Sequence, residues 1–549
     1  MKPRDYQIKC EDSIFEEWKE KSSTLIVIPT GGGKTHVIAG VIHRMSPKRS
    51  IVLAHREELI WQARDKIQRV VGMECSIEMG EYAASTNLFN RSPVVIATIQ
   101  TLITGTTKRR MTRFDPMAFG CLIVDEAHHA TSPSYRMVLD HFKQNPALKI
   151  LGVTATPDRS DEEALGQIFE SVAFDYEILD AIHDGWLVPI EQQMVSVAGL
   201  DYSHIRTTAG DLNGADLSAV MEAETILQGV AGASIEIIGS RRAIIFTASV
   251  KQAETICNIL NRHRDGMAGW VCGATAKDVR HQLLAEFQDG RRQVVCNCSV
   301  LTEGFDNPGV EVIVMAKPTK SRALYAQMAG RSTRPLPGVV DGLDSPEARR
   351  GAIASSTKPS CLIVDFVGNS GRHKLMTTAD ILGGNVSEDA IELAVRKAKE
   401  KGVPVNMTKE LEDAEEELRK KIEAARLADE ARKARLVARV KYVSRKVDPF
   451  NCWDLSPVRE RGWHAGKALS EKQRQLLMRQ GLDPDSLGYA QGKQVLIECF
   501  RRWNGKLASL KQCDIIKKRH PAMDTKDLTQ QRASSLIDAI SLKEGWKRN

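Results

Sequence analysis

Short apolar runs alternate with amphipathic stretches over the first two thirds of the chain. The runs Leu25–Ile28 and Leu122–Val124 are each about the length of a buried strand, and Val37–Ile42 places apolar residues at helical spacing. Alternation of this kind is typical of an α/β fold with a doubly wound parallel sheet. The sequence therefore predicts one α/β lobe over residues 1–185 and a second over residues 225–372.

The pattern changes between and after the lobes. Residues 186–224 begin with the apparent exit from the first lobe and become polar, so we expect an inter-lobe connection there. The Pro- and Gly-rich excursion 335–359 predicts a surface loop, with disorder as an open alternative. Ala, Glu, Lys, Leu and Arg dominate from Ser387 to Val440, so the segment 373–448 is predicted to form charged helices with one narrow apolar stripe. Packing of this stripe against the lobes is favoured over a dimerising coiled coil, because strict heptads are not sustained.

An internal repeat of about 40 residues marks the last segment, 449–549, as a separate all-α module. Ser470–Arg479 matches Ser509–Lys518, and each copy is followed by a turn and a second predicted helix. Two such units would bury apolar faces against each other. The tryptophans near the unit boundaries are expected to anchor a core rather than to stack on bases; they are Trp463, Trp503 and Trp546.

Positive charge is concentrated in this last part of the chain. Residues 441–549 hold 22 Lys and Arg against 12 Asp and Glu, a net charge of +10, whereas residues 1–440 have a net charge of −3. A basic region favours a salt-dependent hold on nucleic-acid phosphates, and a basic face kept for solubility is the competing interpretation. The repeat places basic residues at equivalent positions, which favours DNA binding slightly over a recruiting protein partner; they are Lys472, Lys511, Arg479 and Lys518.

Composition indicates the cellular compartment of the protein. The N-terminus lacks an apolar signal region, and the sequence contains no run near ~18 uninterrupted apolar residues. The 11 cysteines are scattered, and Cys296 and Cys298 fit a packed strand face better than a metal site. We expect a cytoplasmic protein that does not bind membranes.

A glycine-rich loop over Pro29–Thr35 lies between an apolar run and a predicted helix. Glycines let successive backbone N–H groups turn toward phosphates, and the new helix N-terminus adds its dipole. Lys34 would reach the β- and γ-phosphates, and the Thr35 hydroxyl would bind Mg²⁺. The pattern departs from the usual one at Ile28, where a phosphate loop has glycine. The predicted ATP-binding residues of the loop are Thr30, Gly31, Gly32, Gly33, Lys34 and Thr35.

Two consecutive carboxylates, Asp125 and Glu126, follow the apolar run Leu122–Val124. Acids at the end of a buried strand are costly unless a metal or a substrate uses them. Asp125 fits a Mg²⁺ partner, and Glu126 fits the base that orients the attacking water. A solvated acidic pair is the alternative, but a phosphate loop elsewhere in the lobe favours an ATP hydrolysis site.

With both motifs present, the chain resembles the superfamily 2 DEAD/DEAH-box helicases. It is most similar to the branch that contains RadD, the phage helicase UvsW and restriction-enzyme helicase subunits. The resemblance covers residues 1 to about 370 and implies two tandem RecA-like lobes. Besides the phosphate loop and the acidic motif, it rests on seven segments in the family's order: Arg4–Gln7, Leu53–Leu59, Ala97–Leu102, Thr154–Pro157, Ile244–Ser249, Leu301–Asp306 and Gln327–Arg334.

The resemblance also implies roles for single residues. Arg331 and Arg334 would act from the second lobe on the transferring phosphoryl group, and their spacing predicts one face of a helix. Surface salt bridges are the alternative for both. Asp306 would reach the nucleotide, and His128 would contact Gln327. The implied catalytic residues are Lys34, Asp125, Glu126, Gln327, Arg331 and Arg334.

Further contacts follow from the same resemblance. Arg4 and Gln7 are implied to read the adenine base. Coupling between the ATP site and the nucleic acid is implied for His128, Thr154 and Thr156. The implied nucleic-acid contacts are His55, Arg56, Thr98, Gln100, Thr247 and Thr302.

The sequence thus predicts an ATP-dependent DNA helicase or translocase that uses ATP and Mg²⁺. Its expected substrate is single-stranded or branched DNA, and its expected context is repair, recombination or replication. The preference for DNA rests on overall likeness to the branch named above. The alternatives are an RNA helicase and, from another class, a nucleotide-gated clamp or assembly factor that does not unwind nucleic acid.

Overall fold

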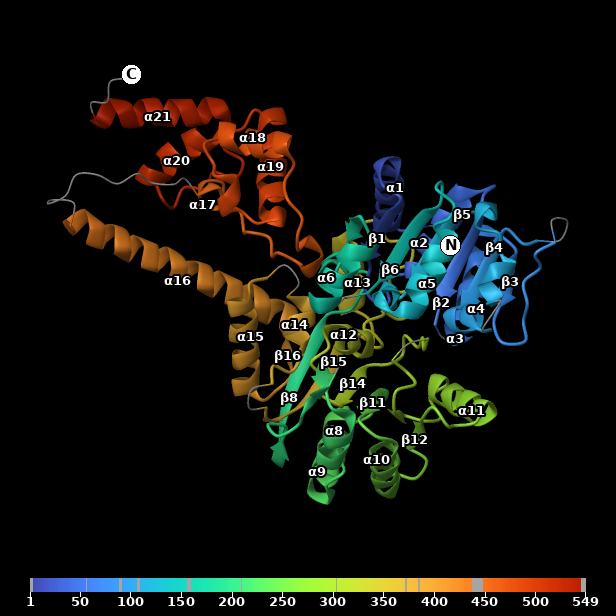
Figure 1. Ribbon diagram of the computed structural model, residues 1–549. Helices are drawn as coiled ribbons and strands as arrows, with labels where there is room; N and C mark the ends of the chain where they lie inside the picture. Colours follow the sequence, from blue (N-terminus) through green and yellow to red (C-terminus); the bar gives the residue numbers. More distant parts are fainter. Residues whose placement is uncertain are drawn as a thin grey trace. The chain divides into compact units, whose positions relative to one another are not determined.

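Seven parallel strands form the sheet of the first lobe, in the order β3-β4-β2-β5-β6-β1-β7 (Figure 1). The strands are β1 (Ser23–Val27), β2 (Arg49–Ala54), β3 (Cys75–Glu78), β4 (Val94–Thr98), β5 (Phe119–Asp125), β6 (Lys149–Thr154) and β7 (Ser171–Asp175). Every residue of β1, β2 and β4 is buried, as expected for parallel strands covered on both faces. The helices are α1 (Asp5–Glu20), α2 (Lys34–Met45), α3 (Glu57–Val71), α4 (Ile99–Ile103), α5 (Pro133–Phe142), α6 (Arg159–Ile168) and α7 (Ile178–His183).

A second seven-stranded sheet follows, in the order β12-β13-β11-β14-β15-β8-β16. Its neighbouring strands are parallel except for β16, which pairs antiparallel with β8. The strands are β8 (Ile190–Asp201), β11 (Ala243–Thr247), β12 (Ala268–Val271), β13 (Val294–Asn297), β14 (Val312–Ala316), β15 (Cys361–Asn369) and β16 (Val405–Asn406). The two sheets confirm the predicted pair of RecA-like α/β lobes.

Helices and one small hairpin complete the second lobe. The helices are α8 (Gly214–Met221), α9 (Glu224–Ile238), α10 (Val250–His263), α11 (Lys277–Gln288), α12 (Arg322–Ala329), α13 (Pro346–Ala354), α14 (Thr378–Leu382) and α15 (Glu388–Lys401). The hairpin joins β9 (Thr207–Thr208) to β10 (Asp211–Leu212). An apolar core from α9, α10 and the central strands holds this lobe together.

The structure is a computed structural model that describes residues 3–55, 57–87, 91–105, 109–155, 159–208, 210–302, 304–370, 373–383, 386–436 and 448–544. The chain forms two compact units. The first comprises Met1–Gly384 with Glu388–Glu416, and the second comprises Asn385–Ser387 with Glu417–Asn549. Both lobes therefore belong to one unit, and the C-terminal module belongs to the other. Among the described helices, none combines the length and apolar character needed to cross a bilayer.

Two predicted connections differ in the structure. Within 186–224, β8 is a full strand of the second sheet, paired with β15 over most of its length. The excursion 335–359 is not a plain surface loop, because it contains α13. Arg349 is 4% exposed and Lys358 is 2% exposed, and their side chains donate to backbone carbonyls. These long-range hydrogen bonds, which local composition does not reveal, order the excursion.

A buried acid in β15 gives the second lobe a pH-dependent stability. Asp365 accepts hydrogen bonds from Tyr325 Oη and Gln192 Nε2, and its burial raises its pKa to about 6 from an ordinary value of 3.8. An acid whose pKa rises on folding lowers stability once the pH exceeds its unfolded value, and the cost is complete above its folded value. We expect Asp365→Asn to raise the free energy of unfolding by up to about 3 kcal/mol at pH 8.

The test is thermal unfolding of the wild type and Asp365→Asn at pH 5 and pH 8. The gain in melting temperature should be largest at pH 8 and shrink at pH 5. Glu286→Gln is the control, because the Glu286 side chain lies on an exposed helix and its pKa is lowered by Arg292. An Asp365→Asn gain that is equal at both pH values would contradict the argument.

The second compact unit shows the predicted repeat as two helix pairs (Figure 1). Its helices are α17 (Pro449–Cys452), α18 (Glu471–Arg479), α19 (Tyr489–Asn504), α20 (Leu510–Arg519) and α21 (Gln530–Glu544), and α16 (Met407–Leu436) precedes them. Ser470 and Ser509 cap α18 and α20 with the same capping box, formed with Gln473 and Gln512. One apolar core joins the two pairs, so the repeats bury each other's faces.

Candidate active site

The phosphate loop joins β1 to α2. Gly31 and Gly33 have φ values of 86° and 81°, a left-handed conformation that glycine adopts without strain. A Cβ on Gly32 would lie 2.7 Å from Ile28 Cγ2, so Ile28 packs directly beneath the loop. The departure from the usual pattern at Ile28 therefore replaces a glycine with a core side chain and leaves the loop itself intact. Lys34 begins α2, as predicted.

Lys34 forms an ion pair with the acidic motif. Lys34 Nζ lies 2.6 Å from Glu126 Oε1, and the two side chains are 14% and 10% exposed. Burial opposes the charged amine, but the carboxylates of Glu126 and Asp125 outweigh burial and raise the pKa of Lys34. Glu126 itself has a φ of 51°, which turns the chain sharply after β5. The predicted base thus lies directly beside the predicted phosphate ligand.

The two arginines of the sixth motif follow α12 and do not lie on a helix, contrary to the prediction. The helix ends at Ala329, and Arg331 instead donates to the Thr302 and Phe305 carbonyls at 2.7 and 2.6 Å. Arg334 forms an ion pair with Asp306. The fifth-motif loop therefore holds both guanidinium groups, which is a tertiary effect that residue spacing cannot encode.

Arg334 nevertheless reaches the phosphate loop of the other lobe. A Cβ on Gly31 would lie 3.2 Å from Arg334 Cγ, and a Cβ on Gly330 would lie 2.6 Å from Thr30 Cβ. Arg331 also acts electrostatically on Lys34. The second lobe thus brings positive charge to the loop, and Asp306 contacts Arg334, the residue that presents that charge.

Aromatic and cationic side chains stack beside the first motif. Tyr6 stacks on Tyr176 with ring centroids 4.3 Å apart, and Tyr6 Oη donates to the Gly32 carbonyl. The guanidinium groups of Arg4 and Arg349 pack over the Trp186 ring, with their Cζ atoms 4.3 and 3.9 Å from the ring centroid. Gln7 Nε2 donates weakly to the same Gly32 carbonyl at 3.4 Å.

The sequence motifs named Arg4 and Gln7 but missed three partners in this stack: Tyr176, Trp186 and Arg349. Trp186 lies in the segment between the lobes and Arg349 lies in α13, so only the fold brings them together. The stack ties the first motif, the inter-lobe segment and the excursion of the second lobe to one another.

Of the residues implied to couple the ATP site to the nucleic acid, the structure describes His128 and Thr154. His128 Nδ1 lies 3.5 Å from Thr154 Oγ1 and 3.6 Å from Glu126 Oε2. The predicted contact of His128 with Gln327 is not among the hydrogen bonds of the described residues; Gln327 is buried in α12, 5% exposed. Thr156 and Arg56 lie outside the described residues.

The implied nucleic-acid contacts show different degrees of exposure. Gln100 is exposed, and its Nε2 donates to the His55 carbonyl at 3.3 Å. Thr98 is 6% exposed and its hydroxyl donates to Thr101, and Thr302 is also 6% exposed. Thr247 is 1% exposed, and its hydroxyl lies 3.1 Å from both the Asn297 and the Ser249 carbonyl oxygens. Its contact with nucleic acid stays a prediction.

Helix α3 supplies contacts to the second lobe that the motifs did not predict. Gln62 Nε2 donates to the Gly304 carbonyl, and Glu57 forms an ion pair with Lys277 at 2.8 Å. Burial and the positive charge of Arg334 lower the pKa of Lys66 on the same helix, against the opposing effect of Asp306. Gln62 and Lys66 thus lie beside the fifth and sixth motifs, and Glu57 contacts α11 of the second lobe.

Comparison with known families covers both lobes. Residues 1–159 match the family described as "Type III restriction enzyme, res subunit", and residues 230–335 match the "Helicase conserved C-terminal domain". The provisionally assigned ATP-dependent helicase IRC3 of Saccharomyces cerevisiae is 28% identical over 384 residues, which cover 67% of this chain and 52% of that protein.

Two further similarities extend over the same region. The provisionally assigned DNA 3'-5' helicase Rad25 of Haloarcula marismortui is 27% identical and covers 61% of this chain and 51% of its own. A fragment structure of a provisionally assigned type I restriction enzyme HsdR subunit from Vibrio vulnificus YJ016 has a TM-score of 0.49 and 20% identity, covering 67% of this chain and 64% of its own. The chain spans about half the length of both curated relatives.

The matched domains occupy the two lobes that carry the phosphate loop, the acidic motif and the arginine motif. The match over residues 1–159 contains the phosphate loop and the acidic motif, and the match over residues 230–335 contains the arginine motif. In both lobes the chain is therefore similar to the helicase domains of superfamily 2.

Proposed function

We propose that the protein is an ATP-dependent DNA translocase or helicase. The observation that supports this most strongly is the convergence of Lys34, Glu126 and Arg334 from three motifs and two lobes on one phosphate loop. Hydrolysis at such a site changes the contacts between the lobes. Because nucleic-acid-binding surfaces lie on both lobes of such enzymes, a change in the cleft moves one surface relative to the other.

The residues of the site divide the chemical work. ATP binds with its phosphates on the backbone N–H groups of the loop and on Lys34, at the N-terminus of α2. This binding gives Lys34 a new counter-ion and releases Glu126 from the 2.6 Å ion pair, so that the carboxylate orients the attacking water. Arg334 then stabilises the charge on the transferring phosphoryl group from the second lobe.

The same loop fits a magnesium ion. Thr35 at the start of α2 and Asp125 at the end of β5 would provide oxygen ligands for the ion. The ion neutralises phosphate charge when bound. This donor set explains why an all-protein cluster of carboxylates is not required.

The proposed track is single-stranded or branched DNA. Support comes from the relative named as a DNA 3'-5' helicase and from the basic C-terminal module. A role in repair, recombination or replication, a cytoplasmic location, and a recruiting protein that binds the repeat module are part of the proposal. An RNA helicase and a nucleotide-gated clamp are the alternatives that the experiment must separate.

The test is steady-state ATP hydrolysis by the wild type with single-stranded DNA, duplex DNA, forked DNA or RNA. Glu126→Gln serves as the blank for contaminating ATPase. Strong stimulation by a DNA form is the expected result, and stimulation by RNA alone would replace DNA with RNA as the track. Hydrolysis that ignores every nucleic acid would overturn the proposal and favour the clamp or assembly factor.

A further inference from the structure

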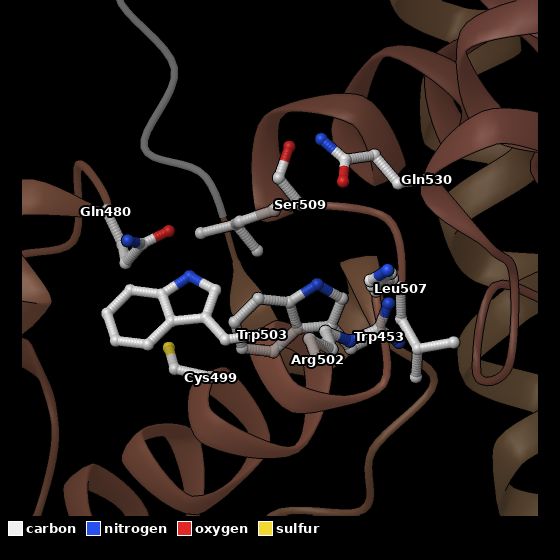
Figure 2. A pocket seen from close by; sticks show the side chains of 10 residues that line it. Trp453, Gln480, Cys499, Arg502, Trp503, Leu507, Ser509 and Gln530 are labelled. Atoms are coloured by element: carbon white, nitrogen blue, oxygen red, sulfur yellow. The ribbon is translucent and has the colours of Figure 1, made fainter.

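The C-terminal unit contains a cavity of about 220 Å³ between the end of α19 and the start of α20 (Figure 2). Trp453 and Trp503 form one part of its wall, and Ser509 and Gln530 lie across from them. Gln480 and Lys506 also line the cavity, and its lining residues include no acid. The cavity thus combines aromatic faces, amides and positive charge.

Trp503 offers an accessible aromatic face. It is 52% exposed and makes an edge-to-face contact with Phe500, with ring centroids 5.5 Å apart. The prediction that Trp503 anchors a core is therefore wrong, whereas Trp463 is 3% exposed and does lie in a core. Trp546 lies outside the described residues. An indole that is half exposed at a cavity can accept a flat partner on its face.

Trp453 is a buried donor with an unmet hydrogen bond. It is 1% exposed, and among the described residues its Nε1 has no hydrogen-bond partner. Leaving a buried donor unsatisfied is costly, and a bound acceptor would remove that cost. Arg502 packs over this indole at 5.2 Å and is itself fixed by Glu498 and by the Ala508 and Thr525 carbonyls. The floor of the cavity is therefore rigid before any ligand arrives.

The remaining polar groups suit a base attached to a phosphate. The side-chain amides of Gln480 and Gln530 and the Lys506 amine take part in none of the hydrogen bonds or ion pairs of the described residues, so they are available to a ligand. An amide offers a donor and an acceptor, as the edge of a base requires. Burial raises the pKa of the Cys499 thiol to about 11, so this lining sulfur is neutral and suits binding rather than nucleophilic chemistry.

We propose that this cavity binds one nucleobase of a single-stranded nucleic acid, with the base stacked on Trp503 and its phosphate near Lys506. The inference extends the proposed function by placing a second nucleic-acid site outside the two lobes. An apolar side chain from a protein partner is the less favourable occupant, because it would leave the Trp453 N–H and both amides unsatisfied. The net charge of +10 over residues 441–549 also suits a polyanion.

The test measures binding of the full chain, without nucleotide, to fluorescein-labelled oligo(dT), oligo(rU) and an abasic oligonucleotide of equal length. Trp503→Ala should weaken oligo(dT) binding about 5- to 100-fold, since one base–aromatic stack contributes that much. Binding to the abasic strand should change little. Trp503→Phe should retain most of the affinity for oligo(dT). Lys506→Gln should weaken binding to both oligo(dT) and the abasic strand and flatten the salt dependence of binding.

Ile497→Ala is the matched control, because Ile497 is 68% exposed on the same helix and does not line the cavity. Equal affinity of the wild type, Trp503→Ala and Ile497→Ala for oligo(dT) and also for oligo(rU) would overturn the proposal, as would an equal loss on the abasic strand. An effect confined to oligo(rU) would keep the base site and make RNA its ligand.

The kcat of DNA-stimulated hydrolysis at saturating DNA should be unchanged in Trp503→Ala, which also shows that the variant is folded. If the wild type lacks such stimulation but Trp503 still discriminates between oligo(dT) and the abasic strand, the proposed function fails and the base site stands. If the wild type is stimulated and Trp503 does not discriminate, the base site fails and the proposed function stands.

Discussion

Replacing Arg334 with alanine is expected to lower the kcat for ATP hydrolysis by about 10³- to 10⁵-fold, the range over which an arginine finger acts. The reason is geometric. Arg334 belongs to the second lobe, yet its side chain lies 3.2 Å from the position that a Cβ on Gly31 would take. Its Nε lies 3.5 Å from the same position, and Asp306 pairs with its guanidinium group.

The measurement is steady-state hydrolysis at saturating DNA, together with binding of a fluorescent ATP analogue. Binding should change only modestly, because Lys34 and the loop backbone carry most of the ground-state contacts. Arg291→Ala is the matched control, since Arg291 lies in the same lobe and pairs with Asp289 on the surface. Such an exposed pair contributes under about 1 kcal/mol. Normal hydrolysis by Arg334→Ala would show that the cleft is assigned wrongly.

The parts of the fold that follow from local sequence were predicted correctly. The first sheet, and the second apart from β8 and β16, follow from apolar runs separated by amphipathic helices, and the phosphate loop and acidic motif lie where their strands end. These features are local because a strand, a turn and a helix N-terminus each depend on neighbouring residues. The ion pair of Lys34 with Glu126 joins two such motifs across the top of one sheet.

The errors arose where tertiary contacts decide. Arg331 and Arg334 were expected on a helix, but hydrogen bonds to the fifth-motif loop hold them after α12. The excursion 335–359 was expected to be a loop, but Arg349 packs on Trp186 and orders α13. In each case the deciding partner is remote in sequence, so periodicity and composition carry no signal of it.

The C-terminal cavity also depends on tertiary contacts that the sequence does not reveal. The repeat was visible in the sequence, and the two capping boxes follow from Ser470 and Ser509. Trp453, however, lies outside the repeat, and only folding places it against Trp503 at one cavity. A tryptophan alone predicts a core, and an exposed tryptophan with a buried, unsatisfied neighbour indicates a binding site.

Replacing Glu126 with glutamine is expected to lower the kcat for hydrolysis by about 10²- to 10⁴-fold, the usual contribution of a positioned base. Glutamine keeps the shape of the side chain but cannot accept a proton from the attacking water. It also removes the carboxylate that neutralises Lys34 at 2.6 Å, so ATP becomes the main counter-ion of that amine. We therefore expect ATP binding to be unchanged or tighter, whereas Lys34→Ala should lose it.

The measurements are hydrolysis, equilibrium ATP binding and displacement of a labelled DNA strand, all on the same preparations. Hydrolysis by Glu126→Gln at the wild-type rate would support the alternative that Asp125 and Glu126 are a solvated acidic pair. With hydrolysis stopped, the same variant separates the motor from the clamp. A motor that steps by repeated cleft closure needs turnover and loses strand displacement in Glu126→Gln, whereas a nucleotide-gated clamp still closes on DNA with ATP bound and releases it when ATP is removed.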